Sequence, residues 1–270
     1  MKATVLIDNI ASKNLVPEWG LSIYIEYGGY TVLLDTGGSG RFLENAASMG
    51  IDICKVQAGV LSHAHYDHSD GMEAFFKVNQ GASFYLREGS GENCYGKKWI
   101  FSRYIGIRKG TLETYENRIV YVTGDYELAP GVYLIPHKTP GLEETGRKNH
   151  MYIKKGRQWF PDNFSHEQSL VFDTSNGLVI YNSCSHGGAD NIIREVEQTF
   201  PGKKLYALIG GFHLYQAREE EVRALAGRIL ATGIEKVYTG HCTGQKAFGY
   251  LKEELGGRVS QLHTGLMIEL

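Results

Sequence analysis

The chain has 270 residues, a hydrophobic content of 42% and a formal net charge of −2. This length allows a sizeable core, and the balanced charge gives no indication of a nucleic-acid partner. No apolar run is long enough to span a membrane, and the first run, Met1–Asp8, is too short for a signal peptide. The four cysteines are scattered and form no CxxC pair, which is typical of reduced thiols. We therefore expect a cytoplasmic protein.

The N-terminal segments predict strands followed by a helix. Ala3–Asp8 is apolar, and Leu21–Tyr27 alternates apolar and polar residues before a glycine pair and a returning strand at Tyr30–Leu34. Phe42–Met49 has the pattern of a short helix. Asp35 stands directly after a strand, where it can serve as a turn residue or contribute to a site.

The stretch after a short apolar strand predicted at Ala58–Leu61 holds four side chains that can bind metal, namely His63, His65, Asp67 and His68. Neutral imidazoles and a carboxylate suit zinc, manganese or iron. The first two histidines can point into one site, and Asp67 and His68 into a second, which is the arrangement of a two-metal centre. A histidine-rich surface turn is the alternative, but four ligand-type residues in this spacing disfavour it.

The region from about 87 to 165 has a weaker pattern than the segments before it. Strand-like pieces remain at Ile119–Val122 and Val132–Ile135, and the rest is rich in glycine, aromatic and charged residues. We interpret it as a loop-rich insertion, within a single domain of residues 1–270, that covers the metal site and shapes a pocket.

Basic residues lie among the aromatic residues of this region, with Lys97 and Arg103 as examples. Such a combination suits a flat ring that bears a phosphate group. Both residues are therefore candidate contacts for a small, phosphorylated and aromatic substrate. A solvated loop with packed aromatic residues is the alternative.

A second group of reactive side chains follows a predicted β-hairpin. Its strands are His166–Phe172 and Leu178–Asn182, joined by an Asn-Gly turn, and the second strand ends in a polar loop with Cys184 and His186. The Cys184 side chain can touch a metal as a thiolate, or it can pack as a buried small hydrophobe.

Two further histidines, His213 and His241, each follow a short predicted strand and precede a predicted helix. Both can face the same end of a sheet as His63. His213 can act in acid–base chemistry or substrate binding, or serve as a structural histidine. The histidines expected to be ordinary surface or structural residues are His137, His150 and His263.

The H-x-H-x-D-H pattern of His63–His68, after a short apolar strand, resembles the signature of the metallo-β-lactamase-fold superfamily. The E-Q-x-L segment at Glu167–Leu170, the C-S-H segment at Cys184–His186, and the G-G-F-H-L and G-H-C-T-G segments are similar to one subgroup. That subgroup is named for 7,8-dihydropterin-6-methyl-4-(β-D-ribofuranosyl)aminobenzene-5′-phosphate synthase. The likeness runs from Asp35 to the C-terminus, and it implies an α/β fold, an αββα sandwich of two mixed sheets with outer helices.

The resemblance also implies two divalent metal ions, with zinc foremost and manganese or iron as alternatives. In the subgroup the histidine of the C-S-H segment looks like the ligand, so His186 is favoured over His166, which is left as a supporting residue. Cys184 stands where the superfamily has a bridging aspartate, and Asp35 stands where it has a residue that supports the metal loop. The implied ligand sets are His63, His65 and His186 for site one, and Asp67, His68 and His241 for site two.

Three functions remain open at this point. The first is a dinuclear metal-dependent hydrolase of a small phosphoester, cyclic ester or lactone, in which a bound water loses a proton near neutral pH. The second is the namesake reaction, in which an arylamine ribosyl phosphate displaces a diphosphate from the pterin. The third is a redox or sensing module without hydrolysis, which Cys184 and iron-compatible ligands permit. Asp67 and His213 are the candidate catalytic residues, and Glu167 is a further candidate substrate contact.

Overall fold

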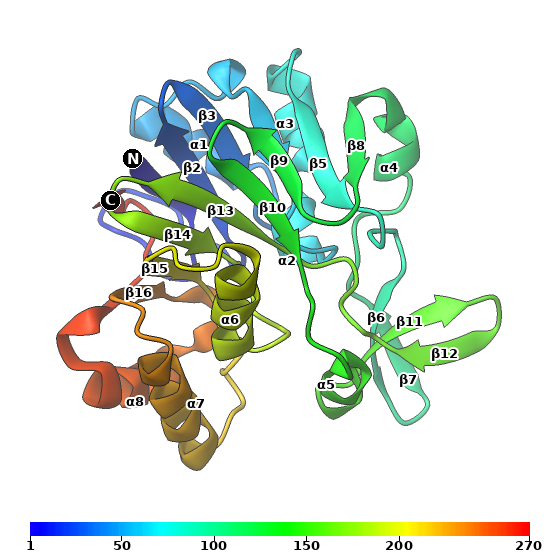
Figure 1. The fold of residues 1–270 in the computed structure, drawn as a ribbon. Coiled ribbons are helices and arrows are strands. Elements are labelled where there is room, and N and C mark those ends of the chain that lie inside the picture. The colour runs from blue at the N-terminus through cyan, green and yellow to red at the C-terminus, as the bar shows by residue number, and fades with distance from the viewer.

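The structure, a computed structural model, describes residues 1–270. Two seven-stranded sheets pack face to face, and helices cover both outer faces (Figure 1). The chain begins and ends in the same sheet, where the first and last strands pair with each other. No helix has the length and apolar character that crossing a membrane requires.

The first sheet combines an antiparallel and a parallel half. In order across the sheet, its strands are β18 (Met267–Glu269), β1 (Lys2–Ile7), β2 (Ser22–Tyr27), β3 (Tyr30–Leu34), β4 (Ala58–Val60), β5 (Ser83–Arg87) and β8 (Ile119–Val122). Strands β3, β4, β5 and β8 are parallel to one another, so their C-terminal ends meet at the same edge.

The second sheet also combines an antiparallel half with a parallel half. In order, its strands are β17 (Val259–Gln261), β16 (Lys236–Thr239), β15 (Leu205–Gly210), β14 (Gly177–Tyr181), β13 (Gln168–Thr174), β10 (Val132–Pro136) and β9 (Tyr126–Ala129). Strands β14 to β17 are parallel, whereas β13, β10 and β9 pair in antiparallel fashion. The parallel strands again deliver their C-terminal ends to one edge.

Alternation along the strands builds three apolar layers. In β13, Leu170 and Phe172 enter the core between the two sheets, while Val171 faces the helices outside. In β3, Leu34 enters the inter-sheet core and Leu33 the core on the other outer face. Each strand therefore buries both of its faces, which explains why its sequence is nearly continuously apolar. The predicted αββα sandwich is confirmed.

The helices separate into two outer layers. Those of the N-terminal half cover the first sheet, and α6 to α8 cover the second (Figure 1). The α-helices are α1 (Arg41–Ser48), α2 (Tyr66–Ser69), α3 (Met72–Val78), α4 (Thr111–Thr114), α5 (Leu142–Lys148), α6 (Ala189–Thr199), α7 (Glu219–Ala231) and α8 (Gln245–Leu255). The 3-10 turns are η1 (Ile53–Lys55), η2 (Glu116–Arg118), η3 (His241–Thr243) and η4 (Gly256–Arg258).

The strands predicted at Ile119–Val122 and Val132–Ile135 are present as β8 and β10, but the rest of residues 87–165 holds more regular structure than the loop-rich insertion that the sequence predicts. Three of their strands, β8 to β10, belong to the two large sheets, and four more form a third sheet that projects beside α5 (Figure 1). Its strands show little alternation because much of their surface is exposed and carries lysine and aromatic side chains, so the periodic signal was weak. In order, they are β12 (Gln158–Pro161), β11 (Met151–Lys155), β6 (Cys94–Lys98) and β7 (Phe101–Tyr104).

Candidate metal centre

The ends of parallel strands from both large sheets converge on one buried group of polar side chains. Strand β4 leads into His63, and β14, β15 and β16 lead into His186, His213 and His241, respectively. Strand β3 ends directly before Asp35. Parallel strands present their C-terminal ends at the same edge, so the fold gathers residues that are far apart in sequence.

The three residues predicted for site one lie together. Ligand atoms of His63, His65 and His186 are all within 4.8 Å of one another, and all three side chains are buried. The Nε2 atoms of His63 and His65 and both ring nitrogens of His186 have no hydrogen-bond partner. Buried polar atoms are normally paired, so this concentration of free nitrogen lone pairs fits a metal ion.

The three residues predicted for site two also meet. His68 Nε2 lies 3.2 Å from His241 Nε2, and Asp67 Oδ2 lies 3.5 Å from His241 Nε2 and 3.9 Å from His68 Nε2. Cys184 Sγ is 3.3 Å from His68 Nε2 and also within 4.8 Å of a His63 ring nitrogen. The Cys184 thiol therefore stands between the two groups.

The ring nitrogens that face away from the centre are held by protein groups. Asp35 Oδ2 is 2.8 Å from His68 Nδ1, and the same carboxylate accepts hydrogen bonds from the backbone N–H and the hydroxyl of Ser62, both at 2.7 Å. Ser62 Oγ lies 2.8 Å from His63 Nδ1, and Asn9 Oδ1 lies 3.2 Å from His241 Nδ1. These contacts leave each Nε2 directed at the centre, as is usual for histidines that bind metals.

The electrostatics favour the neutral form of the site-one histidines. Burial, reinforced by neighbouring imidazoles, lowers the pKa of His63 and of His186 well below the ordinary value. Burial and the nearby His166 lower the pKa of His65 to about 3. A neutral imidazole is the form that binds a metal, so the donors fit divalent ions without first losing protons. Burial alone would lower the pKa of His241, but Cys242 and Asp67 raise it to about 9.

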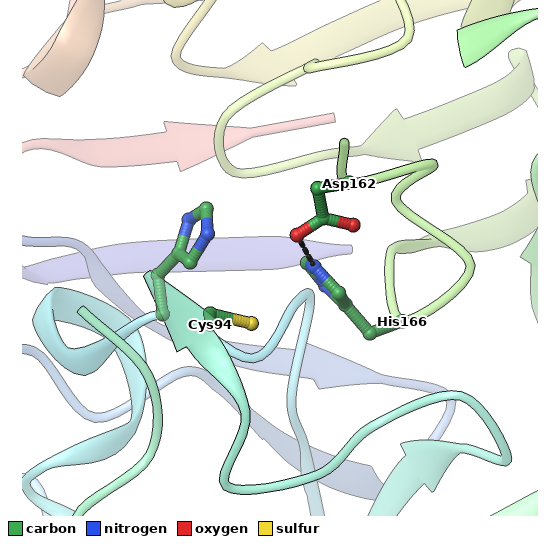
Figure 2. Close-up of side chains that lie close together, drawn as sticks. Cys94, Asp162 and His166 are labelled. Carbon is green, nitrogen blue, oxygen red and sulfur yellow. Dashed lines mark hydrogen bonds and ion pairs between the residues drawn. The ribbon is translucent and has the colours of Figure 1, made fainter. Parts of the chain in front are cut away.

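His166 lies outside the site-one group. Its ring centroid is 6.3 Å from that of His63, compared with 5.0 Å for His186. Its Nδ1 accepts the backbone N–H of Ala64 at 3.2 Å, and its Nε2 lies 3.1 Å from Asp162 Oδ2 (Figure 2). An Nδ1 that accepts leaves the proton on Nε2, which donates it to Asp162.

The Asp162 carboxylate supports this side of the centre. It accepts the backbone N–H of Phe164 at 2.8 Å and faces His166. Ligand atoms of Asp162, His166, Cys94 and His65 lie within 4.8 Å of one another, and Figure 2 shows the first three facing each other. Because His166 is occupied as a donor, this cluster forms a buried polar backing behind His65.

Glu167 does not lie where a substrate contact would. Its carboxylate is buried and accepts the backbone N–H of His186 through both oxygens at 3.2 Å. The predicted role is corrected: Glu167 orients the loop that carries His186, and a substrate cannot reach its carboxylate.

Of the two roles predicted for His137, surface or structural, the structure shows the structural one: it is a buried link between two acidic residues. Its Nε2 lies 3.4 Å from Glu167 Oε2, and its Nδ1 lies 3.1 Å from Glu195 Oε2. Burial alone would lower the pKa of His137, but the carboxylates of Glu167 and Glu195 raise it to about 10. The charged imidazolium of His137 thus connects Glu195 on α6 with Glu167, which in turn accepts the backbone N–H of His186. Glu195 lies 58 residues from His137, so the sequence held no local signal of this contact.

A cavity of about 240 Å³ opens onto the centre. Arg103 lines it, as predicted for a substrate contact, whereas Lys97 points away and donates to the backbone oxygen of Trp99 at 2.8 Å. His213 also lines the cavity, and its Nδ1 has no hydrogen-bond partner. The cavity walls are formed by Trp19, His65, Tyr66, Asp67, Arg103, Ile105, Met151, Cys184, His186, His213, Tyr215 and Cys242.

Comparisons with known proteins agree with this geometry. Residues 19–150 match the family model of the metallo-beta-lactamase superfamily. The chain is 27% identical to a 7,8-dihydropterin-6-methyl-4-(beta-D-ribofuranosyl)-aminobenzene-5'-phosphate synthase from Methanocaldococcus jannaschii, over 100% of this chain and 96% of that protein. The predicted resemblance to that subgroup is confirmed.

Solved structures show the same fold. A metal-dependent hydrolase of the beta-lactamase superfamily superposes with a TM-score of 0.86 and 28% identity, over 100% of this chain and 99% of the other. A diphosphatase from the PhnP family, at 16% identity, shares the fold with a TM-score of 0.57, over 100% of this chain and 97% of the other. The chain therefore has the metallo-beta-lactamase fold, and its residues 19–150 resemble the members of that superfamily in sequence.

Proposed function

We propose that this chain is a dinuclear metal-dependent hydrolase that acts on a small phosphorylated or ester substrate. The observation that carries the proposal is the pair of ligand groups at one cavity, His63, His65 and His186 beside Asp67, His68 and His241. Two divalent cations held there would supply positive charge that polarises a phosphoryl or carbonyl oxygen and lowers the pKa of a bound water.

The residues around the ligands have distinct tasks in this proposal. Arg103 offers a guanidinium at the cavity wall, which suits a phosphate group on the substrate. His213 lines the cavity and its buried Nδ1 has no hydrogen-bond partner, so in this proposal it delivers a proton to the leaving group. Trp19 and Tyr215 meet edge to face with centroids 5.7 Å apart, and they form an aromatic rim that suits a flat ring.

A groove of about 560 Å³ adjoins the same histidines and gives room for a substrate larger than phosphate itself. It shares His186, His213 and Tyr215 with the smaller cavity. A substrate can therefore place its reacting group near the metal ligands in the smaller cavity and extend the rest of the molecule into the groove.

The second candidate function is transfer of a dihydropterin group, favoured by the likeness to the synthase over the full chain. In that reaction Arg103 would hold the diphosphate leaving group, and the groove would admit the arylamine. Both reactions would use the same metal ligands. The residues around the metal centre, and not the ligands themselves, therefore decide which of the two reactions takes place.

The test is an assay of metal-loaded protein against a phosphodiester, a lactone and a dihydropterin diphosphate, each with and without the arylamine ribosyl phosphate. We expect hydrolysis without the arylamine, and loss of it in His213→Gln, with His263→Gln as the control because His263 lies outside the cavity. Diphosphate release that requires the arylamine would establish the synthase instead. Activity that survives complete removal of metal would contradict both.

A further inference from the structure

A second cysteine reaches the metal centre besides Cys184. The Sγ atoms of Cys184 and Cys242 are 3.4 Å apart, and the two residues are 3% and 1% exposed. They come from the loop after β14 and from the turn η3 after β16, 58 residues apart. Both line the cavity, so the pair belongs to the wall of the centre.

The position of the Cys242 sulfur is fixed from two sides. The backbone N–H of His213 points at Sγ with a distance of 3.2 Å. On the other side lies Gly211, where an added Cβ would be 2.5 Å from the same sulfur. A backbone N–H that points at sulfur stabilises the thiolate, as it does in protein metal sites. The backbone at His213 and Gly211 thus holds the Cys242 sulfur in one position.

The Cys242 sulfur also lies within reach of a shared metal. Its Sγ, the Cys184 Sγ and a ring nitrogen of His241 are all within 4.8 Å of one another. Separately, Cys184, His186 and His213 meet the same criterion, as do Cys184, His63 and His68. Cys184 therefore lies within 4.8 Å of members of both ligand groups, and Cys242 adds a second sulfur on the side of His241.

We propose that Cys184 and Cys242 are both thiolate ligands of the metal centre and that together they make it select zinc over manganese. The inference rests on the proposed dinuclear centre. Thiolate is a soft ligand that suits zinc, whereas manganese prefers carboxylate, carbonyl and water oxygens. Binding converts each S–H into a sulfur–metal bond, and one proton per cysteine passes to the solvent.

The choice of zinc over manganese has a direct test. Protein freed of metal is given equal zinc and manganese, and the bound metals are counted. We expect the wild-type chain to take up zinc almost exclusively and Cys184→Ser/Cys242→Ser to retain a clearly larger share of manganese. Cys54→Ser is the matched control, because Cys54 is an exposed free cysteine outside the centre. An unchanged ratio in the double variant would overturn the proposal.

Cobalt loading tests the two sulfurs individually. A thiolate bound to cobalt(II) gives an ultraviolet charge-transfer band that imidazole and carboxylate ligands do not give. We expect the band in the wild-type chain and in Cys54→Ser, a weaker band in Cys242→Ser, and none in the double variant. A full band in Cys242→Ser would overturn the role of Cys242. If no cobalt binds at all, the dinuclear centre itself fails; if cobalt binds without the band, only the thiolate proposal fails.

X-ray absorption at the zinc edge of the unaltered chain guards against variants that do not fold. Sulfur neighbours at about 2.3 Å from zinc are expected, in addition to nitrogen or oxygen at roughly 2.0–2.2 Å. A spectrum with nitrogen and oxygen neighbours alone would contradict both thiolate ligands, whatever the variants do.

Discussion

At the scale of single residues, the centre depends on backbone turns that most side chains avoid. Asp35, Ser185, His213 and His241 have positive φ angles of 57°, 52°, 49° and 45°. Such a conformation costs roughly 1–3 kcal/mol for a residue other than glycine and persists only where the surroundings impose it. Here hydrogen bonds do so: Asp8 accepts the backbone N–H of His241 at 2.9 Å. The turns place Asp35 beside His68, and they bring His213 and His241 to the centre within a few residues of the ends of their strands.

Asp35→Asn tests how much the ligands depend on this support. The Asp35 carboxylate holds His68 and both donors of Ser62, and an amide would present N–H groups to one of them. We expect metal affinity to fall about 10- to 100-fold. Metal titration measures it, and Asp52→Asn serves as the control because Asp52 caps a turn at the surface and pairs with Lys55. Equal affinity in Asp35→Asn and wild type would contradict the supporting role.

His137→Ala tests the buried charge between Glu167 and Glu195. Removing the imidazolium leaves two buried carboxylates facing each other, so we expect a loss of about 3–5 kcal/mol in the free energy of unfolding. The pKa of His137 is raised to about 10 in the folded chain, above the usual value of about 6.5. The stabilisation is therefore complete below pH 6.5 and disappears as pH rises through about 10.

Urea unfolding of the wild-type chain and His137→Ala at pH 6, 8 and 10 measures this dependence. The difference between the two free energies is expected to shrink as the pH rises. A constant difference at all three values would mean that His137 stabilises by packing and not by its charge.

At the scale of elements, most strands of the large sheets were predictable, whereas β9, β17 and the third sheet were not. The two outer layers and the inter-sheet core impose apolar residues on both faces of strands such as β13 and β14, and that pattern is visible in sequence. Strands β6, β7, β11 and β12 lack such faces. Yet this sheet brings Arg103 and Met151 to the cavity, so the part of the chain with the weakest pattern shapes the site.

Arg103→Met, compared with Lys97→Met, tests the contribution of the third sheet to substrate binding. Both residues lie on neighbouring strands, but only Arg103 lines the cavity. Loss of a charge-assisted hydrogen bond costs about 1.5–3 kcal/mol, so KM for a phosphorylated substrate should rise roughly 10- to 100-fold with little change in kcat. Steady-state kinetics decides. If both variants raise KM equally, the effect comes from the positive charge of this sheet and not from a contact of Arg103 with the substrate.

At the scale of the whole molecule, the features that could be predicted are those formed by residues close together in the sequence. The spacing of His63, His65, Asp67 and His68 indicated a metal centre, because these ligands follow one another closely in the sequence. The contacts of His137 with Glu167 and of Cys184 with Cys242 connect distant segments, and only the packing of the two sheets brings them together. Sequence spacing holds no record of such pairs, which is why the support of His186 and the second sulfur were missed.

If the fold assembles two metal sites, the metal content of the purified chain shows it directly. Protein produced with zinc, manganese and iron supplied is analysed for bound metal, together with His65→Ala and Asp67→Ala. We expect about two metal ions per chain, fewer in each of the two variants, and an unchanged content in His263→Ala. Wild-type protein that is folded but contains no metal under these conditions would contradict the assembly of two metal sites.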